Sequence, residues 1–227
     1  MPAYFSPRVF TFLKQLKRNN NREWFLENKE RYISEVRDPM LAFIEAFGRP
    51  LDSISSFYLA DPRSNGGSMF RIYRDTRFSK DKDPYKTHAA AQFRHVKGRD
   101  VHAPGFYLHL EPGMVFAGAG LWHPDAKTAN AIREAIAADP KEWKRAIGGT
   151  TFKRKCTLEG ESLKRPPRGF DADHPLIEDL KRKDFIAATY YTEAQACSGD
   201  FLTQFSRTCR TMAPLMRFLT GALGLKW

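Results

Sequence analysis

The stretch Gly105-Phe-Tyr-Leu-His-Leu-Glu-Pro-Gly-Met-Val-Phe-Ala-Gly-Ala-Gly-Leu121 contains two alternating runs on either side of Pro112-Gly113. This pattern predicts two antiparallel strands joined by a tight turn. With a two-residue loop, one face carries the apolar set Phe106, Leu108, Leu110, Val115, Ala117 and Ala119. The other face carries Tyr107, His109, Glu111, Met114, Phe116 and Gly118. A longer loop would shift the register and exchange these neighbours.

Outside this hairpin, the hydrophobic period changes along the chain. Apolar residues recur at helical spacing in residues 1–60 and again in residues 170–227, while residues 66–160 are richer in strand patterns. We expect the run Asn19–Asn21 to stop the first helix and to cap the second, and Asp38 to cap a third that starts at Pro39. A further strand is expected near Phe152–Leu158. Strands in the middle and helices at both ends predict an α+β fold. Its central, mainly antiparallel sheet would carry helices from the N- and C-terminal regions, in a single domain over residues 1–227.

The composition restricts the partners of the chain. The formal net charge is +11 and the pI is about 9.7, values that fit nucleic acid, an anionic membrane surface, an acidic small molecule or a merely basic surface. The N-terminus lacks the pattern of a signal peptide, and no stretch reaches the roughly 20 apolar residues of a membrane span. The three cysteines form no close pair, so neither a zinc knuckle nor a redox motif is indicated. We therefore expect a cytoplasmic protein that does not bind membranes.

Most of the net charge lies in residues 63–99, where ten Lys and Arg stand against three Asp, a sum of +7. Alternation of apolar and polar side chains predicts a half-buried strand from Phe70 to Phe78. Arg74 would share the side of Phe70 and would need a partner or a ligand there. In the alternative, the strand ends near Arg74 and a loop follows.

The same segment offers a candidate anion site. Arginine presents a planar set of donors that matches phosphate or carboxylate, and Arg71, Arg74 and Arg77 recur at a spacing of three. Asp75 would hold one guanidinium or act as a base. The remaining predicted ligand-binding residues are Lys82, Tyr85 and Lys86, which would close over the ligand, and the loop residues Lys164, Arg165 and Arg168. The loop would flank the same site, meet a phosphate backbone or be solvated.

Histidines supply the candidate proton carriers. His109 lies near Gly118 and Gly120, which leave space for a ligand or a packed helix, and His123 lies at a predicted helix N-terminus. With Asp75, these two histidines are the candidate catalytic residues. Histidines also fall at positions 88, 95, 102 and 109, but neither a helix nor a strand aligns all four. We treat this spacing as coincidence and predict no metal centre, and no motif identifies a cofactor.

The segment from Phe70 to His88 resembles the defining motif of a widespread bacterial family of conserved hypothetical proteins, a domain-of-unknown-function family of about this length. The resemblance continues at residues 105–110, 118–124, 163–170 and 173–175. The residues that match the defining motif are Arg71, Arg74, Asp75, Arg77, Phe78, Lys82 and Tyr85. The resemblance implies a family without an assigned activity, and therefore no catalytic role for any residue.

Three functions follow from these patterns. The first is a pocket for a small molecule that bears phosphate or carboxylate, which becomes an enzyme if a proton carrier lies beside the ligand. The second is a nucleic-acid module with Tyr73, Phe78 and Tyr85 as stacking platforms. The third is a structural or interaction protein whose arginines pair with acidic residues of the N-terminal helices, for example Glu23, Glu27 or Glu30.

Overall fold

The computed structural model describes residues 3–77, 80, 82–98 and 104–227. Its N-terminal helices are α1 (Pro7–Arg18), α2 (Arg22–Glu27), α3 (Lys29–Tyr32), the π-helix η1 (Ile33–Arg37) and α4 (Asp38–Asp52). The strands are β1 (Ala89–Arg94), β2 (Gly105–Glu111), β3 (Met114–Leu121), β4 (Thr157–Glu159) and β5 (Phe185–Tyr191). The later helices are α5 (Ala126–Ala138), α6 (Pro140–Gly148), α7 (Thr150–Lys155), α8 (Ile177–Leu180), α9 (Glu193–Ala196) and α10 (Phe201–Ala222).

The five strands form one antiparallel sheet in the order β1-β2-β3-β5-β4. Glu111 pairs with Met114 across the turn, so the predicted two-residue loop is confirmed, and so is the division of the hairpin into two faces. Gly113 has a φ of +83° in this turn, a conformation that glycine adopts without strain. The observed sheet and helices confirm the predicted α+β class.

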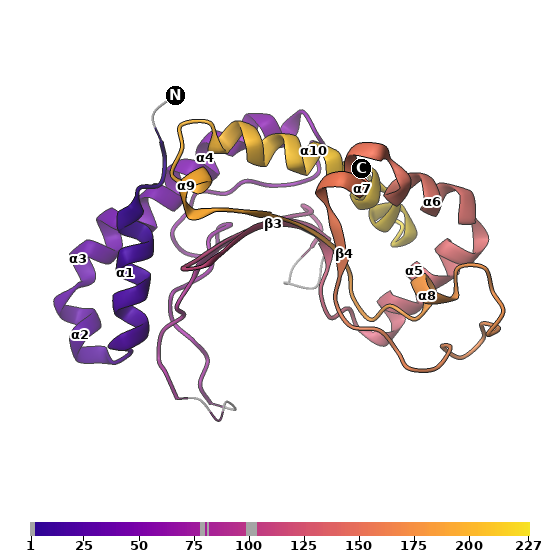
Figure 1. The fold of residues 1–227 in the computed structure, drawn as a ribbon, viewed down its shortest axis with the longest axis horizontal. Helices are drawn as coiled ribbons and strands as arrows, with labels where there is room; N and C mark the ends of the chain where they lie inside the picture. Colours follow the sequence, from indigo (N-terminus) through magenta and orange to yellow (C-terminus); the bar gives the residue numbers. More distant parts are fainter. Residues whose placement is uncertain (1–2, 78–79, 81, 99–103) are drawn as a thin grey trace.

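Helices α4 and α10 cover one face of the sheet, and the sheet curves away from them (Figure 1). Small alanines on that face, such as Ala117 and Ala119, let α10 pack closely on β3. An aromatic cluster fills the space between the layers, with Phe47 in contact with both Phe93 of β1 and Phe205 of α10. This packing fixes the direction of the strands, and therefore the positions of side chains on the opposite face.

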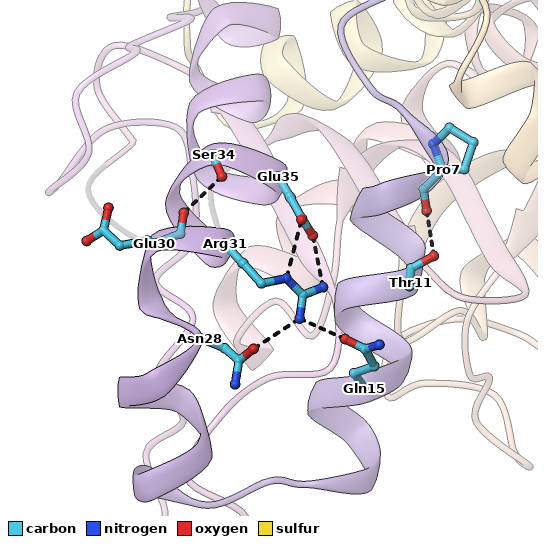
Figure 2. A network of polar contacts seen from close by, with 8 residues as sticks. All are labelled: Pro7, Thr11, Gln15, Asn28, Glu30, Arg31, Ser34 and Glu35. Atoms are coloured by element: carbon cyan, nitrogen blue, oxygen red, sulfur yellow. Dashed lines mark hydrogen bonds and ion pairs between the residues drawn. The ribbon is translucent and has the colours of Figure 1, made fainter.

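Helices α1, α2 and α3 lie at one end of the sheet, and α5 to α8 lie at the other (Figure 1). Arg31 connects helices of the first group: its guanidinium donates to Glu35 at 3.3 Å, to Gln15 of α1 at 2.9 Å and to Asn28 at 3.0 Å (Figure 2). A charged hub of this kind holds α1 at a fixed angle to α3 and η1. Asn21 accepts the backbone N–H of Trp24 at 2.9 Å, which confirms the predicted cap of α2.

Three predicted local structures are wrong. Asp38 does not cap a helix, because its backbone is helical (φ −65°, ψ −40°) and the π-helix η1 carries the chain directly into α4. Pro39 lacks a backbone N–H donor, and the π-helix changes the hydrogen-bond pattern just before it. The helical backbone therefore continues from η1 into α4 without a break. No regular strand forms between Phe70 and Arg77; this segment is extended and pairs only through isolated bridges at Met69 and Tyr73. Phe78 lies outside the described residues.

A strand expected near residues 152–158 is also shorter than predicted, because the helix α7 occupies most of that stretch and only β4 follows it. Among the helices that the structure describes, none has the length and apolar character needed to cross a membrane.

Candidate functional site

The face of the sheet opposite α4 and α10 carries an aromatic and polar surface, which we call the histidine face. It is formed by Tyr107, His109 and Glu111 of β2, by Phe116 and Gly118 of β3, and by Tyr190 of β5. The pairing of Ala89 with Leu110 brings His88, just before β1, to the same place. The rings of His88 and His109 lie 4.6 Å apart between centroids.

A row of hydrogen bonds connects three side chains of β2. The hydroxyl of Tyr107 lies 3.0 Å from Nδ1 of His109, and Nε2 of His109 lies 3.2 Å from Oε2 of Glu111. An ionised carboxylate can only accept a hydrogen bond, so the neutral imidazole of His109 carries its proton on Nε2. Its Nδ1 then accepts a hydrogen bond from the hydroxyl of Tyr107. The row can therefore pass a proton between its ends, or it can present a nitrogen and an oxygen to a cation.

Burial controls the charge of this group. Burial, with the nearby His109 as a smaller cause, lowers the pKa of His88 to about 4. Burial also lowers the pKa of His109, although the hydrogen bond to Glu111 opposes it. Burial and the charge of Glu111 raise the pKa of Tyr107. Both imidazoles are therefore neutral at pH 7, and the phenol keeps its proton.

Beside the histidines, residues 71–77, 80 and 82–87 form an extended hairpin that we call the arm. It projects from the sheet on the side away from α4 and α10 (Figure 1). Tyr73 and Tyr85 form an isolated antiparallel β-bridge. The N–H of Arg74 donates to the carbonyl of Pro84 at 2.9 Å, and the N–H of Lys86 donates to the carbonyl of Ile72 at 2.7 Å. Tyr85 is buried and stacks on Phe25 of α2 with centroids 4.1 Å apart, which fastens the arm to the N-terminal helices.

A pocket of about 540 Å³ lies between the arm and α1. Its wall is formed by Lys17, Arg74, Asp75, Asp83, Tyr85, Lys86, Thr87 and His88. Three cations therefore face two carboxylates, of which Asp75 is bound to Arg77. His88 belongs to this wall and its ring also contacts His109, so His88 lies between the pocket and the histidine face.

The structure separates the three predicted arginines. Arg74 is partly buried in the pocket wall, whereas Arg71 and Arg77 are exposed and do not line the pocket. The guanidinium of Arg77 lies 2.7 Å from Asp75, and this hydrogen bond lowers the pKa of Asp75 to about 2. Such a carboxylate is a weak base at neutral pH, so Asp75 holds a guanidinium, one of the two roles predicted for it.

The predicted lysines and Tyr85 also divide into two groups. Lys86 lies in the pocket wall, where its ammonium donates to the carbonyl of Arg71 at 2.7 Å and lies over the ring of Phe70. Lys82 is exposed and donates to the carbonyl of Thr76 at 3.0 Å, within the arm. Tyr85 contributes to the pocket wall, although most of its side chain packs in the core.

The loop of Lys164, Arg165 and Arg168 lies with α5 and α8 at the other end of the sheet (Figure 1). All three side chains are exposed, and none of them lines the pocket beside the arm. The structure therefore does not bring this loop together with the predicted arginines.

His123 is held in a separate site, at the far end of β3. At about 3.3 Å per residue, it lies roughly 20 Å along the strand from Phe116, the partner of His109. Its φ is +47°, and its Nδ1 lies 3.0 Å from Oδ1 of Asp184, which is buried. Asp184 also accepts the backbone N–H groups of His123 and Glu161, so this pair closes the end of the sheet.

The match to a known family covers most of this architecture. The sequence model of a family described as "Conserved hypothetical protein (DUF2461)" matches residues 8–218. The chain belongs to this family. The match includes the arm, the whole sheet and most of α10, and it confirms the resemblance to a family of conserved hypothetical proteins. No curated protein matches the chain.

Sequence reasoning missed several residues of this site. Lys17 belongs to the helical pattern of residues 1–60, and nothing in its local sequence indicates that α1 faces the arm. Asn20 was predicted to stop a helix, yet its side chain binds the backbone of Tyr85. His88 became part of the site through the pairing of β1 with β2, and an Ala-rich strand of that kind has a weak sequence signal.

Proposed function

We propose that the protein binds a small molecule bearing phosphate or carboxylate in the pocket between α1 and the arm. Lys17, Arg74 and Lys86 are the anion contacts of this proposal. The observation that carries it is the pocket of about 540 Å³, whose wall contains Lys17 of α1 together with Arg74 and Lys86 from the two sides of the arm. Cations that converge on one cavity raise the local concentration of anions and give them several charge-assisted hydrogen bonds.

The partial burial of Lys86 adds support. Lys86 is partly buried, and burial lowers the pKa of its ammonium, so this cation has lost part of its hydration. An anion that enters such a site gains more Coulomb energy than it would at a fully hydrated lysine. The carbonyl of Arg71 and the ring of Phe70 hold the ammonium in place before a ligand arrives.

A binding titration with and without Arg74 tests the proposal. Inorganic phosphate, pyrophosphate and citrate are titrated into the purified protein by calorimetry, and into the Arg74→Gln and Lys86→Gln variants. One lost charge-assisted contact costs about 1.5–3 kcal/mol, so we expect affinity to fall about tenfold or more in each variant. The matched control Lys164→Gln removes an exposed cation far from the pocket and should bind as the parent does. Equal affinity of Arg74→Gln and the parent would remove the basis of the proposal.

A titration with nucleic acid, added to the same experiment, distinguishes the anion-binding function from the nucleic-acid function. Of the predicted stacking residues, Tyr85 is buried, Phe78 lies outside the described residues, and Tyr73 is exposed. A mixed oligonucleotide is titrated at two salt concentrations. Tight binding that collapses with salt, and that Arg71→Gln and Arg77→Gln weaken as much as Arg74→Gln, would favour the nucleic-acid function instead.

A further inference from the structure

We propose that His88, His109 and Glu111 bind one divalent transition-metal ion of the zinc class on the histidine face. Two imidazoles and one carboxylate are a ligand set that such ions accept, with further positions filled by water or by a ligand. The inference concerns the metal alone and does not depend on the anion proposed above.

Distances between the donor atoms fit one ion. One donor atom from each of the three residues lies within 4.8 Å of the others. Nε2 of His109 and Oε2 of Glu111 are 3.2 Å apart. Metal–ligand bonds of about 2.1 Å place adjacent donors roughly 3.0 Å apart in octahedral and roughly 3.4 Å apart in tetrahedral geometry. The observed separation lies between these values, and a donor atom of His88 lies within 4.8 Å of donor atoms of both residues.

The surroundings of His88 also support the assignment. Its ring is about half-buried and lies tilted against that of His109, and it makes no hydrogen bond to any part of the chain that the structure describes. The free lone pair of a neutral imidazole is the form that coordinates a metal. A half-buried histidine that faces a second histidine and a carboxylate is explained by a shared cation.

Tyr107 orients the His109 ring for this role. Without metal, Nε2 carries the proton and Nδ1 accepts from the phenol, as described above. When a metal binds Nε2, that proton leaves the nitrogen and one is taken up at Nδ1, so the imidazole remains neutral. The Nδ1–H then donates to the Tyr107 oxygen. Tyr107 is therefore a positioning residue that stabilises either tautomer.

Metal titration of the untagged, chelator-treated protein tests the site. Zn²⁺ is measured by competition with a chromophoric chelator, and Co²⁺ by its visible absorption bands. We expect one equivalent of metal per chain in the parent, and a loss of affinity of at least about tenfold in His88→Gln and in His109→Gln. The Tyr107→Phe variant should keep the one-to-one stoichiometry with weaker binding.

The chain provides a matched control in its other histidine–carboxylate pair. His123→Asn removes that pair with a residue that tolerates a φ of +47°, and it should bind metal as the parent does. Circular dichroism confirms that each variant is folded. If the buried His109 variant fails to fold, Glu111→Gln, at the turn, replaces it with the same expected loss. Absence of Co²⁺ bands in the parent, or unchanged affinity in folded His88→Gln, overturns the proposal.

Discussion

The side-chain amide of Asn20 forms two hydrogen bonds with the backbone of Tyr85. Its Nδ2 donates to the Tyr85 carbonyl at 3.0 Å, and its Oδ1 accepts the Tyr85 N–H at 3.1 Å. Asn20 follows α1 directly, whereas Tyr85 belongs to the second strand of the arm. The amide therefore takes the place of a neighbouring strand, and it sets the distance between Lys17 on α1 and Lys86 on the arm.

Replacing Asn20 should loosen the arm without unfolding the domain core. We expect Asn20→Ala to lower the free energy of unfolding by about 1–2 kcal/mol, since two hydrogen bonds to partly buried backbone are lost. Hydrogen exchange of the Tyr85 amide should accelerate markedly. Asn19→Ala is the matched control, because the Asn19 side chain binds only the exposed end of α1. Unchanged protection of the Tyr85 amide in Asn20→Ala would show that stacking on Phe25 alone holds the arm.

Two glycines of β3 should respond differently to alanine. A Cβ at Gly120 would lie 1.9 Å from the carbonyl oxygen of Phe185, and its φ is +132°. We expect Gly120→Ala to cost about 3 kcal/mol or more, because the sheet must separate there. At Gly118 the nearest atoms to such a Cβ are 3.7 Å away, so Gly118→Ala should change stability by less than about 1 kcal/mol. Chemical denaturation of the pair measures both, and equal costs would contradict this account of β3.

The ion pair of Asp75 and Arg77 should be visible in a pH titration. The pKa of Asp75 is lowered to about 2 from the ordinary 3.8. Because the pKa of Asp75 is lower in the folded state than in the unfolded state, the ion pair stabilises the folded protein above about pH 4. This contribution is lost as the pH falls toward 2. Carboxyl-detected NMR should therefore give a pKa of about 2, which Arg77→Gln returns toward 3.8. In the control Arg71→Gln the pKa should rise only slightly, because Arg71 is the smallest of the causes.

Asp184 should be more important for stability than its position after a loop indicates. It accepts the N–H groups of His123 at 2.7 Å and of Glu161 at 2.9 Å while its side chain is buried. Asp184→Asn turns an amide NH₂ toward one of these donors, so we expect a loss of about 2–3 kcal/mol in the free energy of unfolding.

Asp139→Asn provides the comparison for Asp184, since asparagine caps a helix as well as aspartate does and should leave stability nearly unchanged. Thermal or chemical unfolding would contradict the prediction if both variants lost the same amount.

The hairpin of β2 and β3 could be predicted because its residues alternate and its turn contains Pro112-Gly113. Strand β1 could not be predicted as easily, because alanine is uncommon in strands and gives no alternation. It forms because Ala89 and Ala91 fit beneath the helical layer while Phe93 fills the aromatic cluster. Strand β5 is absent from the sequence prediction, although its Phe, Ile, Thr and Tyr residues are typical of strands.

The candidate site likewise contains residues that the sequence could bring together and residues that it could not. Arg74 and Lys86 lie within one local hairpin, so their neighbourhood follows from the sequence of that segment, and both line the pocket. Arg71 and Arg77 belong to the same hairpin but are exposed and do not line the pocket. The meeting of His88 and His109 depends on the pairing of β1 with β2, a contact between segments that no local pattern encodes. Without β1, the sequence could not indicate that these histidines are neighbours.

The outer edge of β1 has a further consequence for how the protein tolerates change. Residues 68–70, which lead into the arm, bond to this edge: the Phe70 N–H donates to Ala90, and the Gln92 N–H donates to Ser68. A strand edge without such cover can recruit a second copy of the chain and start aggregation. Truncations that remove the arm together with these residues would therefore expose the edge of β1 and cost solubility as well as the pocket.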